Sequence, residues 1–455
     1  MGITIVQKSN LKEKKPKAKR ALVLAGGALT GAAFKIGGLK AFNDYFTNFN
    51  IVDFNIFLGI SSGSLLATSL MGGLTPEEML KSLDGSSKKF SKLEPWHFYW
   101  PNWEEFCLRP FRYAARAATW LPGLVWSLAT KLPGKQNGIK DLLWQFVQHP
   151  SLSHYETLWE MLEESTLEDH PFPSLMECFP SGVFDNGPLE RYLRQNIRRN
   201  RMTNNFKLAE KLGGKKLYIT AMTLDGAQEV VFGPDERNDV TISKAVQASS
   251  AMPGFYKPVK IGEEYFVDGG VKHTANLDLM VDKGAKLIIC YNPFRPYENK
   301  SFVDYVSKGR KTKQHSLSEE GVFAVLNQFF RTVFHTRLHA ALKMYGQSPT
   351  FDGDILLIEP RADDQAFFSM NPFALGHRLH AAQLGFESVR NSIEEKYDEI
   401  KKILASYNIE MSREGVEAEY KKMRKKVDPF MLKKILEEGR RGQKKKRSGG
   451  RAMRV

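Results

Sequence analysis

The stretch LGISSGSLLATSL at residues 58–70 decides the fold. It continues an apolar run, passes through a small-residue turn and resumes as small and apolar residues, which predicts a strand, a tight turn and a helix. Within the turn, Gly59, Ser61 and Gly63 form the pattern G-x-S-x-G, which is typical of a nucleophile elbow in this context. The glycines remove side chains that would crowd the turn, so the Ser61 hydroxyl can project into a cleft. An ordinary strand-to-helix turn is the alternative interpretation.

Apolar strands alternate with helical patterns along much of the chain. The strand-like runs read RALVL, FNIFL, KLYITAMTL, EVVFG, EEYFVD and AKLIICY. This alternation predicts an α/β fold with a mostly parallel central sheet that is covered on both faces. Functional residues in such sheets gather at the carboxyl ends of strands. Three strand ends carry unusual residues, namely Gly26 with Gly27, Ser61, and Asp268.

A glycine-rich turn, AGGALTGA at residues 25–32, follows the first of these strands. Backbone N–H groups at such a helix start form a natural oxyanion hole for acyl transfer. A dinucleotide fingerprint is the competing interpretation, but Gly26, Ala28 and Gly31 make an imperfect G-x-G-x-x-G. The second strand also ends in Ser61, where a ribose-binding acid would be expected.

A serine nucleophile needs a base. Of the ten histidines, His273 is the one near a suitable strand end. In FVDGGVKHTANLDL, residues 266–279, Asp268 lies where a strand breaks at Gly269 and Gly270. A carboxylate there could accept the serine proton directly, giving a dyad without histidine. An aspartate that caps its own turn is the alternative interpretation.

Together these features resemble the patatin-like phospholipase family. The similarity extends to SGVFDNGPLERYL (181–193), KAVQASSAMPGFYKPV (244–259) and YFVDGGVKHTANLDLMVDKGAKLIICYNP (265–293). It covers roughly residues 20–300, with weaker likeness to about 390.

The resemblance implies a three-layer α/β/α sandwich and serine-dependent hydrolysis of lipid acyl esters through an acyl-serine, without a metal or cofactor. It implies that Ser61 is the nucleophile and Asp268 the general base, and that the amides around Gly26, Gly27 and Ala28 form the oxyanion hole. The other motif glycines are Gly31, Gly59, Gly63, Gly269 and Gly270.

The chain departs from the family pattern in the glycine-rich loop, which usually reads G-G-G-x-[K/R]-G. Ala28 replaces the third glycine, and alanine is penalised if that position needs a positive φ. Thr30 replaces the basic residue, so a cation at that position is missing, and Leu277 stands where a proline is common. These departures favour a second function, a catalytically weak or inactive patatin-fold scaffold on membranes.

The net charge of +15 is concentrated at the two ends of the chain. Residues 1–20 hold seven Lys and Arg against one Glu, and residues 421–455 hold fifteen against three acids, which leaves the 400 residues between them at −3. Basic tails of this kind favour an anionic membrane surface, and solubilising ends are the alternative. The near-neutral body argues against specific nucleic-acid binding.

The composition also divides the chain. We expect a basic flexible arm over 1–20, a catalytic domain over 21–390 with an aromatic helical insertion at about 92–180, and a charged, basic helical extension over 391–455. The insertion could be an interfacial platform, a lid, or a small extra core. Its aromatic residues include Trp96, Phe98, Tyr99, Trp100, Trp103 and Trp120.

The first 20 residues have no apolar core for a signal peptide, and no run reaches the roughly 18 apolar residues of a membrane span. We therefore expect a cytoplasmic protein that is peripheral on membranes, with lipid esters as substrates. Cys107, Cys178 and Cys290 are too few and scattered for a disulfide framework or a metal knuckle.

Overall fold

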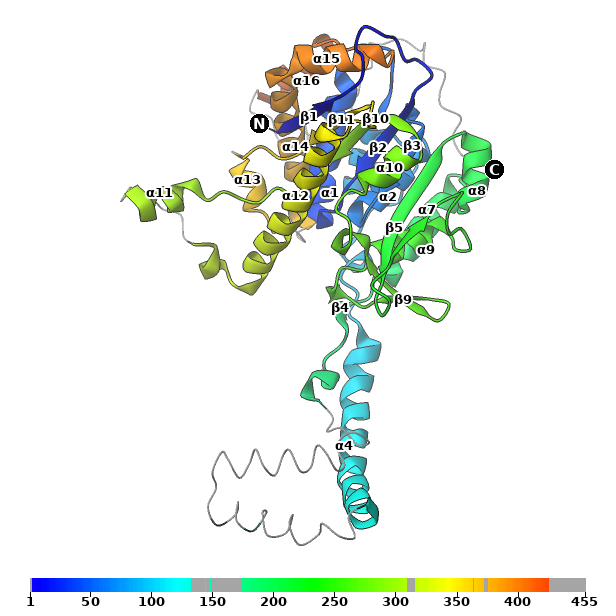
Figure 1. The fold of residues 1–455 in the computed structure, drawn as a ribbon, viewed down its shortest axis with the longest axis vertical. Coiled ribbons are helices and arrows are strands. Elements are labelled where there is room, and N and C mark those ends of the chain that lie inside the picture. The colour runs from blue at the N-terminus through cyan, green and yellow to red at the C-terminus, as the bar shows by residue number, and fades with distance from the viewer. Residues whose placement is uncertain are drawn as a thin grey trace. The chain divides into compact units, whose positions relative to one another are not determined.

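The computed structural model describes residues 2–131, 174–308, 316–362, 364–371 and 375–424, together with residues 144 and 148 (Figure 1). The chain divides into two compact units. The larger consists of Met1–Trp100 and Asn186–Val455, and the smaller of Pro101–Asp185. The larger unit contains the central sheet and every candidate site residue.

The central sheet has nine strands among the described residues, in the order β1-β11-β10-β2-β3-β5-β9-β8, with β6 paired to β5. The strands are β1 (Ile3–Gln7), β2 (Lys19–Leu24), β3 (Ile56–Gly59), β5 (Lys216–Thr223), β6 (Glu229–Phe232), β8 (Val259–Ile261), β9 (Glu264–Asp268), β10 (Ala285–Tyr291) and β11 (Asp354–Ile358). Strands β11, β10, β2, β3 and β5 run parallel to one another. Strands β1, β6, β8 and β9 pair antiparallel.

The α/β class is confirmed, but the sheet is mixed, so the expectation of a mostly parallel sheet is wrong in that respect. The central parallel strands are continuous apolar runs because both of their faces are buried, and the sequence marks them clearly. The antiparallel strands lie at the two ends of the sheet. Strand β8 is three residues long and includes the exposed Lys260, so it carries no apolar run that a sequence pattern could detect.

The amino-terminal residues also differ from expectation. The sequence predicts a flexible arm over residues 1–20, whereas Ile3–Gln7 form an edge strand whose register pairs Ile5 with Leu356. Ile3 and Val6 are buried there. The pairing partner lies some 350 residues along the chain, so local composition does not reveal it.

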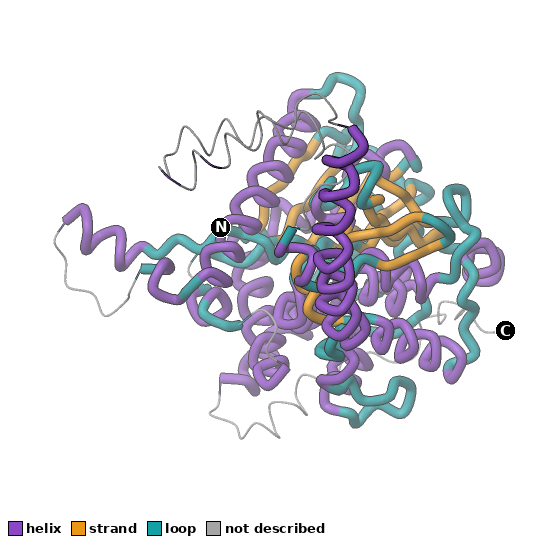
Figure 2. Tube along the Cα trace, turned by 90° about the horizontal axis from the view of Figure 1, so that it is seen from below, coloured by secondary structure: helices purple, strands orange, loops and turns teal. Residues whose placement is uncertain are grey.

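Helices cover both faces of the sheet (Figure 2). On one face, side chains of α10 (Leu277–Asp282) and α12 (Val322–Gln347) share a core with alternate residues of β2, β3, β10 and β11. On the other face, the Tyr291 hydroxyl of β10 donates to the Phe34 carbonyl of α1 (Ala28–Tyr45) at 3.4 Å. The result is the three-layer α/β/α arrangement.

The remaining described helices of the larger unit are α2 (Ser62–Met71), α3 (Pro76–Asp84), α7 (Gly187–Arg199), α8 (Phe206–Gly213), α9 (Ile242–Ser249), α11 (Lys300–Lys308), α13 (Gln365–Phe368), α14 (Arg378–Glu395), α15 (Tyr397–Ser406) and α16 (Glu414–Arg424). Ile400, Ile403 and Leu404 of α15 are fully buried. The first part of the expected charged extension therefore packs into the body. The rest of that extension, residues 425–455 with the basic end of the chain, lies outside the described residues.

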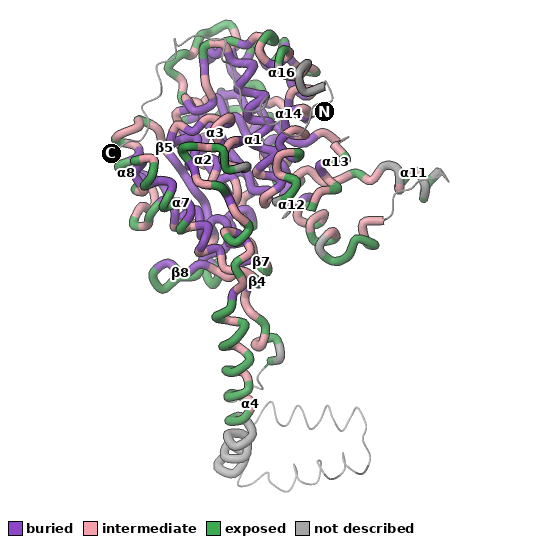
Figure 3. Tube along the Cα trace, turned by 180° about the vertical axis from the view of Figure 1, so that it is seen from behind, coloured by how far each residue is buried: buried purple, intermediate pink, exposed green. Residues whose placement is uncertain are grey.

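The smaller unit is built on α4 (Trp103–Lys131), with the short strand β4 (Gly182–Phe184). Ser181 binds Glu105 through its amide at 2.6 Å and its hydroxyl at 2.9 Å. Most described residues of α4 are solvent-exposed (Figure 3), and Phe111 is 73% exposed. The side chain of Trp120 falls outside the described set. In the larger unit, Trp96 and Trp100 are exposed whereas Phe98 is buried.

The described part of the chain contains no helix that combines the length and the apolar character needed to cross a bilayer.

Two glycines allow α1 and α14 to pack backbone against backbone. A Cβ at Gly37 would lie 1.7 Å from the Ala382 carbonyl oxygen, and a Cβ at Gly385 would lie 1.9 Å from that of Phe34. Gly37, which weakens the helical pattern in the sequence, is therefore required by the packing of the two helices.

Replacing Gly37 by alanine should lower the free energy of unfolding by about 1–3 kcal/mol, because the methyl group must push the two helices apart. Chemical denaturation measures the change. The matched control is Gly346→Ala in α12, where a Cβ meets nothing within 4 Å. That substitution should stabilise by up to about 1 kcal/mol through helix propensity. Equal effects of the two substitutions would contradict the close packing.

Candidate active site

Ser61 lies on a strained turn between β3 and α2. Its backbone has φ 54° and ψ −130°, a conformation that costs a non-glycine residue about 1–3 kcal/mol and clusters at functional sites. Hydrogen bonds fix both the amide and the carbonyl of Ser61. The Ser61 amide donates to the Ser249 hydroxyl at 2.9 Å, and the Ser61 carbonyl accepts from the Ser64 hydroxyl at 2.6 Å. The surrounding bonds therefore determine where the Ser61 side chain points.

Gly59 and Gly63 of the elbow must be glycines because other backbone atoms lie too close to them for a side chain to fit. A Cβ at Gly63 would lie 1.9 Å from the Leu24 carbonyl oxygen, and a Cβ at Gly59 would lie 2.4 Å from the Ser64 Cα. Helix α2 consequently begins directly against the end of β2. The elbow pattern in the sequence thus has a steric cause in the structure.

Asp268 ends β9 and is buried. Its carboxylate accepts a hydrogen bond from the Gly270 amide at 2.8 Å, and the nearby Ser61 side chain stabilises its ionised form. Gly269 lies against β5, where a Cβ would be 2.5 Å from the Thr220 carbonyl oxygen. Asp268 therefore caps its own turn and also lies near Ser61, so the two alternatives that the sequence left open are compatible with each other.

Burial raises the pKa of Asp268 to about 6. The hydrogen bonds from Ser61 and Gly270 and the positive charge of Lys35 act in the opposite direction. A carboxyl group with this pKa is ionised at neutral pH and is more basic than an ordinary aspartate. A carboxylate of this basicity can accept a proton from a nearby hydroxyl.

The glycine-rich loop lies beside the elbow and leads into α1. A Cβ at Gly26 would be 3.2 Å from the Ser61 Cβ. Gly27 is the N-cap of α1 and has φ 147°, and Ala28 has φ 51°. The first amides of a helix have no acceptor within it, so they are available to an oxyanion. Gly31 continues the first turn, with its amide donating to the Gly27 carbonyl at 3.0 Å.

Lys35 is a site residue that the sequence analysis missed. It is fully buried, and its ammonium donates to the carbonyls of Ala25 and Gly26, the latter at 3.1 Å. Burial lowers the pKa of Lys35 to about 7, opposed by the charge of Asp268. A cation therefore does lie beneath the loop, supplied by Lys35 although Thr30 replaces the family's basic residue. A lysine inside the apolar stretch AAFKIGGL was the available signal.

The histidine that the sequence offered as an alternative base, His273, contacts Glu229. Its Nδ1 lies 2.9 Å from Glu229, which also accepts a hydrogen bond at 2.9 Å from Asn276. No described contact joins His273 to Ser61, so the histidine alternative from the sequence gains no support.

The chain matches the family described as Patatin-like phospholipase over residues 22–281. This match covers more than half of the 455 residues, and the chain therefore belongs to the patatin-like phospholipase family. Membership places it among the enzymes that hydrolyse lipid esters. No curated protein matches the chain by sequence.

Several solved structures are similar to the chain. VipD from Legionella pneumophila is 16% identical with a TM-score of 0.35, over 87% of this chain and 70% of that one. Human GIVD cytosolic phospholipase A2 is 11% identical with a TM-score of 0.34, over 88% and 61%. The type III effector ExoU of Pseudomonas aeruginosa is 14% identical with a TM-score of 0.31, over 87% and 55%. The chain thus spans less than two thirds of the latter two proteins.

Replacing Ala28 by glycine should raise the free energy of unfolding by about 0.5–1 kcal/mol. The left-handed backbone conformation costs alanine about 1–2 kcal/mol, and glycine avoids this cost. The greater entropy of glycine in the unfolded chain offsets only part of that gain. Chemical denaturation measures the difference. The control, Ala32→Gly within α1, should instead cost about 1 kcal/mol. Destabilisation of both variants would show that Ala28 is not strained.

Proposed function

We propose that the protein is a serine-dependent lipid acyl hydrolase of the phospholipase A or lysophospholipase kind, with Ser61 as nucleophile and Asp268 as general base. The observation that carries the proposal is the nearness of Ser61, on its strained elbow, to the buried Asp268 carboxylate, whose ionised form the Ser61 side chain stabilises, beside a helix-start loop. Family membership supports the lipid ester as the substrate class. The acyl position and the lipid headgroup are left open by this chemistry.

The proposed reaction has two halves. Ser61 Oγ attacks the ester carbonyl while its proton passes to Asp268, and amides of Gly26, Gly27 and Ala28 bind the oxyanion. Asp268 then protonates the departing alcohol, and an acyl-serine is left. Water gives a proton to Asp268 as it attacks the acyl-serine, and Ser61 recovers that proton when the fatty acid leaves.

Lys35 is proposed to position the loop for this reaction. Its ammonium holds the carbonyls of Ala25 and Gly26, so the amides that follow are oriented toward the space above Ser61. A preorganised donor set of this kind needs no rearrangement as the oxyanion develops.

An apolar surface next to the site suits a lipid substrate. Phe294 lies against Gly26, and its ring packs at 5.1 Å on that of Phe334 in α12. The start of the same helix exposes a row of apolar side chains at spacings of three and four residues, so they share one face. These are Val322 (65% exposed), Val325 (47%), Leu326 (44%) and Phe329 (58%).

Contact with a membrane is part of the proposal. In the smaller unit, α4 exposes Trp103, Phe106 and Phe111, which are side chains that favour a lipid boundary. The basic ends of the chain would add attraction to anionic lipid. A cytoplasmic location, peripheral on membranes, stays a prediction from the sequence.

A weakly active or inactive scaffold is the second candidate function. It is favoured by Ala28, whose φ of 51° places strain in the loop that would bind the oxyanion. Activity measurements separate the two functions.

Ser61→Ala and Asp268→Asn should each lower fatty-acid release from mixed phospholipid vesicles by more than about 1,000-fold. Ser82→Ala and Asp225→Asn are matched controls, since Ser82 only bonds within α3 and Asp225 occupies an exposed Asp-Gly turn. Both controls should keep wild-type activity. Activity that survives Ser61→Ala, or a wild type inert toward every ester, would favour the scaffold.

The pH–rate profile of ester hydrolysis should show an acidic limb near pH 6, because Asp268 must be ionised to accept a proton and its pKa is raised to about 6. Lys35→Met should move this limb to higher pH, since it removes a charge that lowers the pKa of Asp268. Lys81→Met, distant in α3, is the control. A profile without an acidic limb would rule out an aspartate base.

Deleting residues 421–455 should weaken binding to anionic vesicles at low salt, and the difference from the full chain should shrink as salt screens the charges. Co-sedimentation with vesicles measures it, with neutral phosphatidylcholine vesicles as the control. Unchanged binding of the truncated chain would refute the role of the tail, and preferential binding to DNA would favour a nucleic-acid partner.

A further inference from the structure

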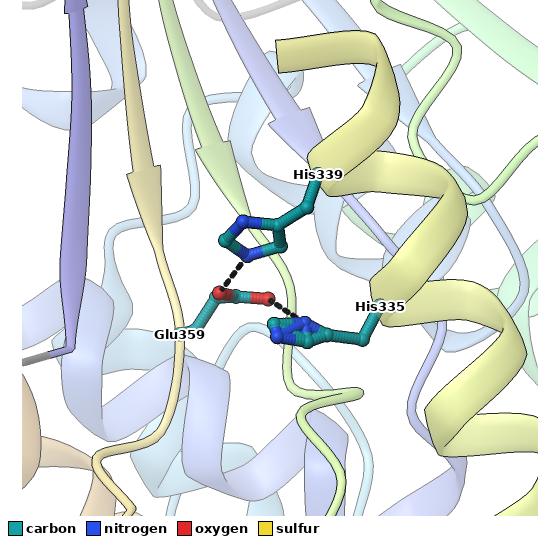
Figure 4. A group of neighbouring side chains, drawn as sticks. All are labelled: His335, His339 and Glu359. Atoms are coloured by element: carbon teal, nitrogen blue, oxygen red, sulfur yellow. Dashed lines mark hydrogen bonds and ion pairs between the residues drawn. The ribbon is translucent and has the colours of Figure 1, made fainter. Parts of the chain in front are cut away.

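Three side chains converge on the larger unit outside the proposed catalytic residues. His335 and His339 are four residues apart on α12, so they lie on the same face of the helix, and Glu359 directly follows β11. Figure 4 shows the Glu359 carboxylate between the two imidazole rings. None of the three takes part in the proposed hydrolysis.

The geometry of this cluster leaves one strong ligand atom unused. His339 Nε2 lies 2.8 Å from one oxygen of Glu359, and His335 Nδ1 lies 3.9 Å from the other, beyond hydrogen-bond distance. His335 Nδ1 is buried and has no hydrogen-bond partner in the described part of the chain. An ion pair between His339 and Glu359 therefore accounts for only part of the arrangement.

We propose that His335, His339 and Glu359 form a binding site for a divalent transition metal of the zinc class, with an open fourth position. Two imidazole nitrogens and one carboxylate oxygen are a ligand set that zinc takes in proteins. The three ligand atoms lie within 4.8 Å of one another. Tetrahedral zinc spaces its ligands by about 3.4 Å, so small side-chain rotations would close the site.

The residues around the cluster hold its side chains in place, as the surroundings of a metal site do. Glu359 is buried, and its carboxylate also accepts a hydrogen bond from the Asn292 side chain at 2.9 Å, the kind of second contact that orients metal ligands. His273 and Glu229 form a similar histidine–carboxylate pair at 2.9 Å. Among the described residues, however, that pair has no third metal-ligating side chain close enough to make a metal site.

A metal here would hold in place the segment that packs against the proposed oxyanion loop. Asn292 is followed by Pro293 and Phe294, which lie against Gly27 and Gly26. Arg331, one turn before His335, donates to the Pro293 carbonyl at 3.1 Å. Metal binding would therefore fix the segment on which the loop rests. This structural role does not depend on the loop being catalytic.

The test uses the full chain, stripped with a chelator and then dialysed against Zn²⁺. The wild type should retain one zinc per chain and unfold at a higher temperature with zinc than without it. His339→Ala and Glu359→Gln should each weaken zinc binding by more than about 100-fold, since loss of a second-sphere partner alone costs about 10–100-fold. His273→Ala is the matched control and should bind zinc as the wild type does.

Two measurements guard against misfolded variants. Thermal unfolding in chelator should give each variant a cooperative transition. Independently, Co²⁺ bound to the wild type should show the intense visible absorption of a low-coordinate site. A wild type that retains no zinc, zinc binding that survives His339→Ala, or only the weak absorption of hydrated Co²⁺ would each overturn the proposal.

Discussion

A backbone contact at the end of β2 governs the geometry of the candidate site. Gly63 lies so close to the Leu24 carbonyl that α2 must begin directly against β2. The chain can make that entry only through a sharp turn, and Ser61 takes the positive φ that the turn requires. The Ser61 hydroxyl is thereby held toward Asp268, whose strand β9 lies two places from β3 in the sheet. The order of strands and one close contact thus arrange the site.

Two buried ionisable groups share this region, and burial moves their pKa values toward each other. Burial raises the pKa of Asp268 to about 6 and lowers that of Lys35 to about 7. Each charge supports the other against the cost of desolvation. The loop above the elbow is therefore held by a lysine whose charge is opposed by burial and supported by Asp268.

The sequence predicts what is local and misses what distant segments create. The elbow at Ser61, the turn at Asp268 and the loop at Gly26 and Gly27 are short patterns with steric causes, so they could be identified before the structure. The edge strand Ile3–Gln7 depends on a partner at residues 354–358. The role of Lys35 depends on carbonyls that the turn after β2 presents to it, and the cluster at Glu359 joins a helix to a strand end. Local sequence marks Lys35 as a lysine in an apolar stretch, but it does not identify the distant partners in any of these contacts.

The pairing of the first and last strands has a consequence for synthesis of the protein. Strand β1 pairs only with β11 among the described strands, and β2 requires β10 on one side. Helix α1, which carries the loop, packs against α14 at residues 378–395. A growing chain has made Ser61 long before these partners leave the ribosome, and such distant contacts form late in folding. The nascent chain therefore cannot complete the sheet and the helix layer around Ser61 until nearly all of the larger unit has been translated.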